Sequence, residues 1–280
     1  MAFNLIDLNK WKRKEFYLHF INDVRCSYSA TVNLDITNLK GQRLYPAMIW
    51  LLTQTVNLFT EFRTALTDEG LGIYDNMHPA YTVFNKERKT FSGIWTEFDS
   101  DYSRFLKSYE NDSAKYSCSA RYSPKPNRPA NSFDISMVPW FTFTAFDIDV
   151  FDDGKYLLPI FTMGKFFDEG DKRMLPLAIQ VHHAVCDGYH IGKFVKKLQE
   201  KILSFSLQIC NINFIGKEKS IAHYTSKTKI VCYLFDQENL NGRHSFVRRF
   251  FAFDRSRFAV RRTCRALFNP SCMRSAERSI

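Results

Sequence analysis

The run Gln180–His190, with the sequence QVHHAVCDGYH, constrains this chain most, because it joins an apolar strand to an amphipathic helix through a short turn. A strand is predicted over Leu175–Val181, which is apolar on both sides as in an interior strand, and the Asp-Gly pair supplies the turn. A helix is predicted from Ile191 to Ile202, where apolar residues recur at spacings of three and four. The loop between them is held at both ends and carries His183.

Histidine titrates near neutral pH, so His183 could take a proton from a hydroxyl group and pass it on. Asp187, four residues later, could supply a fixed charge beside it. Taken alone, His182 and His183 would more often be ordinary core histidines, and Asp187 a turn former. Cys186 is a tempting nucleophile, but its side chain is expected to point away from His183. These histidines and the cysteine lack the second ligand pair that a zinc site needs.

The motif VHHAVCDGYH resembles the active-site segment of the chloramphenicol acetyltransferase family. Other segments resemble the family in the same order along the chain, and they include Trp11–Glu15 (WKRKE), Ile135–Trp140 (ISMVPW) and Phe161–Lys165 (FTMGK). The resemblance covers about Phe3 to Ile202. It implies an α+β fold, a two-layer sandwich of helices on a mixed, largely antiparallel sheet, as in CoA-dependent acyltransferases.

The resemblance also implies an enzyme that moves an acetyl group from acetyl-CoA to the primary hydroxyl of chloramphenicol. His183 would be the general base and Ser136 the donor to the oxyanion, in a ternary complex without an acyl-enzyme. Asp187 and Arg13 would form a buried ion pair that supports the loop. The family is trimeric, with each site between the His183 face of one subunit and the acceptor pocket of the next.

Two sets of binding residues follow from the resemblance. The residues expected to contact the acceptor are Phe20, Cys26, Tyr28, Thr82, Phe91, Gly93, Phe146, Ile148 and Thr162. The residues expected to contact coenzyme A are Arg43, Tyr45, Trp140 and Lys165. One departure is Phe20, which stands where relatives commonly have tyrosine. No metal is expected.

Composition separates residues 1–202 from the remainder. The net charge is +10, and Leu203–Ile280 carries 14 Lys and Arg against 5 Asp and Glu, which leaves the first 202 residues at about +1. This basic extension has no family motif, and we expect it to be disordered or non-native rather than a nucleic-acid binder. With no leader-like segment, no long apolar run and no CxxC spacing among seven cysteines, a cytoplasmic enzyme with free thiols is predicted, away from membranes.

The remaining elements follow from local patterns. Helices are predicted from Tyr45 to about Phe59 and from Ser100 to about Tyr116, and strands are predicted at Gly72–Tyr74, Ala80–Phe84, Thr90–Trp95, Phe141–Val150 and Leu157–Met163.

Three alternatives stay open. A dihydrolipoyl-type acyltransferase catalytic domain shares the His-x-x-x-Asp-Gly motif and a related fold, although that class carries lipoyl domains before it. A non-catalytic protein that sequesters the antibiotic would use the same pocket, and the presence of both His183 and Ser136 argues against it. A nucleic-acid binder would depend on the basic extension, since the first 202 residues are nearly neutral.

Overall fold

The computed structural model describes residues 2–148, 150, 152–215, 221–226, 229–240 and 243–254, with side chains up to Phe205. The chain forms two compact units, Met1–Ile209 and Cys210–Ile280, and each is considered by itself.

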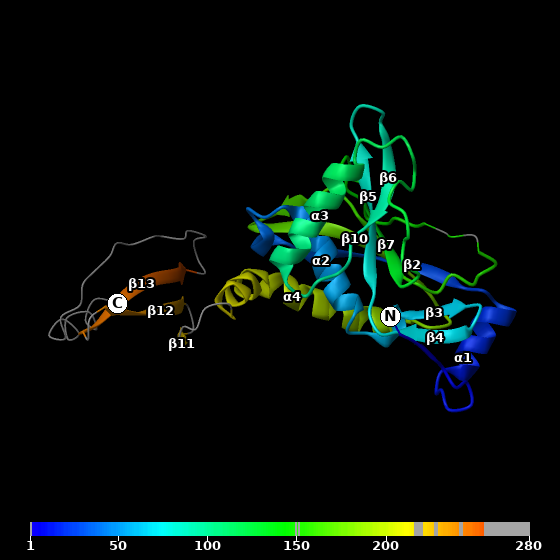
Figure 1. Ribbon diagram of the computed structural model, residues 1–280. Coiled ribbons are helices and arrows are strands. Elements are labelled where there is room, and N and C mark those ends of the chain that lie inside the picture. The colour runs from blue at the N-terminus through cyan, green and yellow to red at the C-terminus, as the bar shows by residue number, and fades with distance from the viewer. Residues whose placement is uncertain are drawn as a thin grey trace. The chain divides into compact units, whose positions relative to one another are not determined.

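The first unit is built on one large sheet (Figure 1). Its strands lie in the order β2 (Ser27–Asp35), β10 (Lys172–His182), β8 (Ile160–Met163), β7 (Ser132–Met137), β5 (His78–Asn85) and β6 (Thr90–Trp95), and β9 (Phe167–Glu169) pairs with β10. β7 runs parallel to both β5 and β8, and the other neighbouring pairs are antiparallel. The predicted mixed, largely antiparallel sheet is therefore confirmed.

The first unit also holds a smaller antiparallel sheet. Its strand order is β1 (Phe3–Leu5), β4 (Gly70–Tyr74) and β3 (Thr64–Thr67). Short helical segments complete the frame: α1 (Lys14–Leu18), η1 (His19–Asp23), η2 (Thr37–Leu39) and η3 (Thr60–Phe62).

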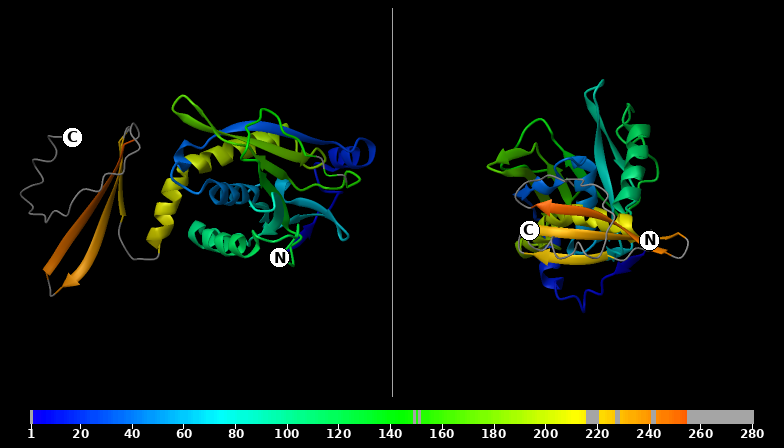
Figure 2. Two further views of the ribbon diagram at one scale, coloured as in Figure 1. Left: turned by 90° about the horizontal axis from the view of Figure 1, so that it is seen from above. Right: turned by 90° about the vertical axis from the view of Figure 1, so that its left-hand side faces the viewer.

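Three long helices form the second layer, on one face of the large sheet (Figure 2). They are α2 (Leu44–Val56), α3 (Tyr102–Tyr116) and α4 (Gly188–Ile215). α2 carries Pro46 in its first turn, where the missing N–H costs no helical hydrogen bond. Asp101 is the N-cap of α3, and its carboxylate accepts the backbone N–H groups of Ser103 at 2.8 Å and Arg104 at 3.2 Å.

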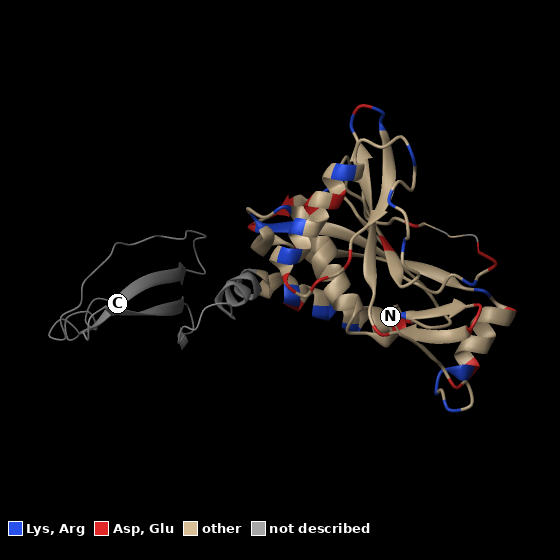
Figure 3. Ribbon diagram, in the orientation of Figure 1, with Lys and Arg blue, Asp and Glu red and all other residues tan. Residues whose placement is uncertain are grey.

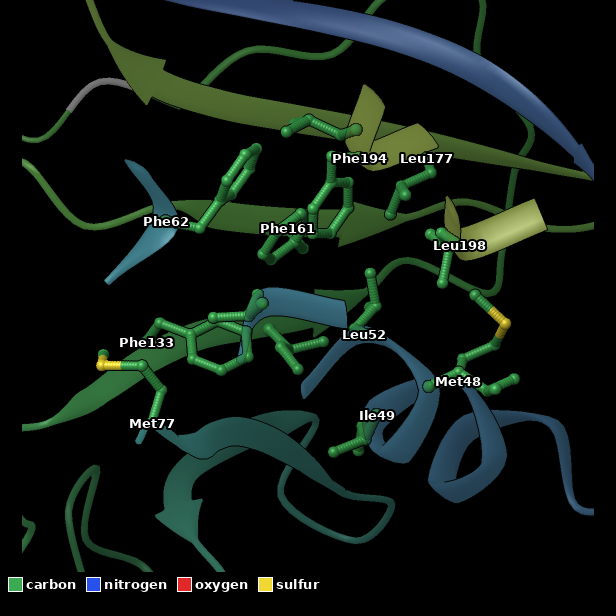
Figure 4. Packing of buried hydrophobic residues seen from close by; sticks show 14 of the residues in the cluster. Met48, Ile49, Leu52, Phe62, Met77, Phe133, Phe161, Leu177, Phe194 and Leu198 are labelled. Carbon is green, nitrogen blue, oxygen red and sulfur yellow. The ribbon is translucent and has the colours of Figure 1, made fainter. Parts of the chain in front are cut away.

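Aromatic and aliphatic side chains share the core between the layers (Figure 4). Phe194 of α4 stacks on Phe62 with ring centroids 4.4 Å apart, and Phe161 of β8 lies 5.4 Å from Phe194. All three are buried. Burying rings from α4, η3 and β8 together fixes the start of α4 against the sheet, and so fixes the loop that precedes it.

The predicted strand Phe141–Val150 is wrong. The segment Val138–Pro159 instead connects β7 to β8, two parallel neighbours that need a long crossover. Its alternation of apolar and polar residues satisfies a strand pattern, but in the described structure it pairs with no other strand.

The helix predicted to end near Ile202 continues to Ile215 as α4. Phe205 is fully buried, with its ring 5.1 Å from Tyr102 and 6.0 Å from Trp50. The side chain of Asn38 also donates to the carbonyl of Leu203 at 2.6 Å. The residues just beyond Ile202 thus pack with the first unit, which ends at Ile209.

In the second unit, β11 (Ile221–Ser226), β12 (Lys229–Leu240) and β13 (Arg243–Asp254) form an antiparallel sheet in chain order. Our expectation that the extension Leu203–Ile280 is disordered or non-native is untested and stays a prediction. In the first unit, acidic and basic residues are interspersed along the chain (Figure 3), in line with its small net charge.

Candidate active site

His183 is the first residue after β10, and its surroundings hold both its backbone and its ring. Its N–H donates to the carbonyl of Cys26 at 2.8 Å, and its own carbonyl accepts from Arg13 Nη2 at 2.9 Å. The imidazole stacks on Phe20 with centroids 4.3 Å apart and planes 5° from parallel, and Tyr28 lies 5.1 Å away. A half-buried imidazole is therefore held in one orientation at the end of the sheet.

Arg13 forms hydrogen bonds along the loop His183–Asp187. Besides the His183 carbonyl, its Nε donates to the carbonyl of Ala184 at 3.0 Å and its Nη1 to Asp187 Oδ2 at 2.8 Å. The side chains of Arg13 and Asp187 are only 15% and 32% exposed. Burial acts to raise the pKa of Asp187, but the hydrogen bond from Arg13 and the nearby His190 outweigh it and hold that pKa below its usual value. Arg13 and Asp187 thus form a partly buried ion pair that spans the loop.

The neighbours of His183 face inward. His182 is 1% exposed, its Nδ1 accepts the N–H of Ala184 at 3.1 Å, and burial lowers its pKa. Cys186 is also 1% exposed, and burial raises the pKa of its thiol well above the ordinary value. Because a thiolate is the reactive form, the buried Cys186 is unsuited to nucleophilic attack.

Ser136 lies on β7 directly opposite Thr162 on β8, and their hydroxyl oxygens are 2.9 Å apart. If Thr162 donates in this pair, the proton of Ser136 is free for another acceptor. The two strands thus hold the Ser136 hydroxyl in place through its neighbour.

A large cavity of about 900 Å³ lies over β5, β6, β7 and the crossover that follows β7. Its lining includes Ser136 and five of the predicted acceptor residues: Thr82, Phe91, Gly93, Phe146 and Ile148. His183, Phe20, Cys26, Tyr28 and Thr162 are not in that lining. Phe20, Cys26 and Tyr28 instead contact His183, and Thr162 lies on β8 beside Ser136, so the predicted acceptor set is divided within one chain.

The four residues predicted to contact coenzyme A are also spread out. Tyr45 and Trp140 line the cavity, where the Tyr45 hydroxyl donates to the carbonyl of Thr82 at 3.1 Å and Trp140 is 59% exposed. Arg43 is exposed and paired with Glu110 of α3, and Lys165 is exposed just beyond β8.

Two sets of polar contacts in and near the site were not predicted from the sequence. On the cavity wall, Asp134 accepts from Arg128 at 2.9 Å and from the Tyr156 hydroxyl at 3.1 Å, although no local pattern joins these residues. In the first turn of α4, His190 lies between Asp187 and Glu61. The only signal for His190 is its place in the motif.

Within the described part of the chain, no three His, Cys, Asp or Glu side chains gather as a metal site. None of the described helices is long and apolar enough to cross a bilayer.

Comparisons with known proteins place this geometry in a family. The family model described as chloramphenicol acetyltransferase matches residues 1–199. A chloramphenicol acetyltransferase from Clostridium perfringens is 51% identical over 207 residues, which are 73% of this chain and 100% of that protein. One from Clostridioides difficile is 50% identical over 213 residues, 75% of this chain and 100% of that protein. This chain belongs to the chloramphenicol acetyltransferase family.

Solved structures agree on the fold. A chloramphenicol acetyltransferase structure has a TM-score of 0.67 at 19% identity and covers 72% of this chain and 100% of its own. A dihydrolipoamide acetyltransferase from Azotobacter vinelandii has a TM-score of 0.51 at 19% identity, covering 65% and 84%. The expected acyltransferase family and fold are therefore confirmed. The sequence comparison favours the chloramphenicol acetyltransferases over the dihydrolipoyl class.

Proposed function

We propose that this chain transfers the acetyl group of acetyl-CoA to the primary hydroxyl of chloramphenicol and thereby inactivates the antibiotic. The observation that carries the proposal is the fixed imidazole of His183, which follows β10 within the family motif and is held by Cys26, Arg13 and Phe20. Family membership supports the substrate pair.

In the proposed mechanism, His183 takes the proton of the substrate hydroxyl as the oxygen attacks the thioester carbonyl. The hydroxyl of Ser136 donates to the oxyanion that forms, while Thr162 donates to Ser136 and keeps it oriented. When the C–S bond breaks, the proton on His183 passes to the departing thiolate sulfur. The burial of Cys186 supports direct transfer within a ternary complex, because the thiol within the motif is held protonated.

We further propose a homotrimer whose sites lie between subunits, with the His183 end of β10 in one subunit facing the cavity of the next. The separation of His183 from the cavity lining in one chain supports this arrangement. The cavity also opens among exposed aromatic side chains, since Phe91 is 53% and Tyr122 67% exposed, and a neighbouring subunit would cover such a surface.

The cavity suits an acceptor with an aromatic ring and few polar groups, because its walls are mostly apolar and carry isolated hydroxyls such as that of Thr82. Arg43, Tyr45, Trp140 and Lys165 remain our candidates for coenzyme A, the cations for its phosphates and the rings for its adenosine. Cys26, Cys118 and Cys186 are free thiols, which suits a protein of the reducing cytoplasm, where we place it.

The direct test is release of coenzyme A thiol from acetyl-CoA in the presence of chloramphenicol, followed with a thiol reagent. The matched control acceptor is chloramphenicol whose primary hydroxyl is already acetylated. We expect release with the first acceptor and background release with the second. Tight binding of chloramphenicol without thiol release would instead support the sequestering alternative.

A further inference from the structure

His190 of α4 contacts both the loop after His183 and Glu61 of η3. Its Nδ1 lies 3.2 Å from the backbone nitrogen of Asp187, which donates to it. Its Nε2 lies 3.4 Å from Glu61 Oε1. Both ring nitrogens of His190 therefore have polar partners, Nδ1 the backbone N–H of Asp187 and Nε2 the carboxylate of Glu61.

His190 takes part in capping the N-terminus of α4. Asp187 is the N-cap residue, and its carbonyl accepts from the N–H groups of His190 and Ile191 at 3.0 and 3.1 Å. An N-cap aspartate ordinarily uses its carboxylate on the helix N–H groups, but here Oδ2 is engaged by Arg13. The third helical residue, His190, reaches back to the N-cap N–H, as the glutamate of a capping box does.

The contacts of His190 connect, through Asp187 and Arg13, to the backbone of His183. Nδ1 of His190 also lies 2.8 Å from Asp187 Oδ1, so the ring contacts both the backbone and the carboxyl group of this residue. Asp187 in turn orients Arg13, and Arg13 holds the carbonyls of His183 and Ala184. A displacement of Asp187 would therefore be transmitted through one guanidinium to the backbone of His183.

We propose that His190, anchored by Glu61, is a positioning residue that fixes Asp187 and, through Arg13, the carbonyl of His183. The role rests on the proposed function only where it concerns turnover. The side chains of His190 and Glu61 are 19% and 27% exposed, and the pair borders a separate cavity of about 290 Å³, so neither needs to touch the substrates. Misplacement by about 1 Å can cost about a hundredfold in rate.

The test compares His190→Ala with His190→Asn, whose side-chain oxygen occupies the position of Nδ1 and can accept the Asp187 N–H. We expect His190→Ala to lower kcat about tenfold or more with KM values changed less than threefold. His190→Asn should recover kcat to within about threefold of wild type. Hydrogen exchange at the Asp187 amide should quicken in the first variant and slow again in the second.

His78 is the matched control, because its Nδ1 likewise accepts a backbone N–H, that of Phe98 at 2.9 Å, in a different part of the unit. His78→Ala should lower thermal stability without lowering kcat. If His190→Ala does not fold, Glu61→Ala removes the anchor alone and should lower kcat while leaving the Asp187 N–H bonded.

Unchanged turnover in His190→Ala, or in Glu61→Ala where that variant takes its place, would overturn the proposal. An equal kcat loss in His78→Ala would also overturn it. If the wild-type protein releases no thiol, the proposed function fails. Hydrogen exchange at the Asp187 amide then tests separately whether His190 holds Asp187 in place.

Discussion

The burial of Phe205 predicts where the chain can be cut. Deleting residues 210–280 should leave the first unit intact, whereas deleting 203–280 removes Phe205 from its contacts with Trp50 and Tyr102. Loss of a fully buried phenylalanine costs about 3–5 kcal/mol, and the hydrogen bond from Asn38 to the Leu203 carbonyl adds about 1 kcal/mol. Against a total stability of roughly 5–15 kcal/mol, the shorter fragment should be close to unfolding.

The assay is denaturant and thermal unfolding followed by circular dichroism. In the full chain, Phe205→Ala should lower the free energy of unfolding by about 3–5 kcal/mol, and Tm by roughly 6–20 °C at 2–4 °C per kcal/mol. Leu203→Ala is the control, because this side chain is 50% exposed and its carbonyl is retained. If residues 1–202 unfold at the same denaturant concentration as residues 1–209, the packing of Phe205 contributes nothing and the reasoning is refuted.

Three further predictions concern the site. Ser136→Ala should lower kcat about a hundredfold with little change in KM, as loss of one oxyanion donor does, and an unchanged rate would remove Ser136 from the mechanism. Cys186→Ala should keep most activity, and mass spectrometry should detect no acetylated protein after exposure to acetyl-CoA alone; a burst of acetyl-enzyme would overturn direct transfer. Stability should fall as the pH is lowered, because burial lowers the pKa of His182 in the folded chain and the unfolded chain therefore binds more protons below about pH 6.5. The stabilisation is present above that pH and is lost below it. His182→Gln should therefore show a smaller drop in Tm between pH 7 and pH 5 than the wild-type protein. The same drop in both proteins would contradict the assignment of this pH dependence to His182.

Much of the site could be predicted from sequence because its central part is local. β10, the turn and the start of α4 are consecutive, so the patterns of strand, turn and helix place His183 without any knowledge of the rest of the fold. The strand predicted at Thr90–Trp95 has the bounds found for β6, and α3 ends at the predicted Tyr116.

What the sequence could not determine depends on pairing between distant segments. Alternation predicted a strand at Phe141–Val150, but only the parallel pairing of β7 with β8 shows that this stretch must be a crossover. The partner of Ser136 across the sheet and the contact of His190 with Glu61 likewise depend on register and packing. The place of Phe205 in the core depends on helix α4 continuing past Ile202, which local periodicity did not reveal.

The role of His183 as the base is tested most directly by thiol release from His183→Ala and His182→Ala, measured beside chloramphenicol binding by calorimetry. We expect His183→Ala to lower kcat at least a hundredfold, the lower range for a lost general base, while binding and Tm stay near wild type. His182→Ala should chiefly lower Tm, since its ring is buried. Retention of more than a tenth of the wild-type rate by His183→Ala, or loss of catalysis only in a stable His182→Ala, would contradict the assignment of His183 as the base.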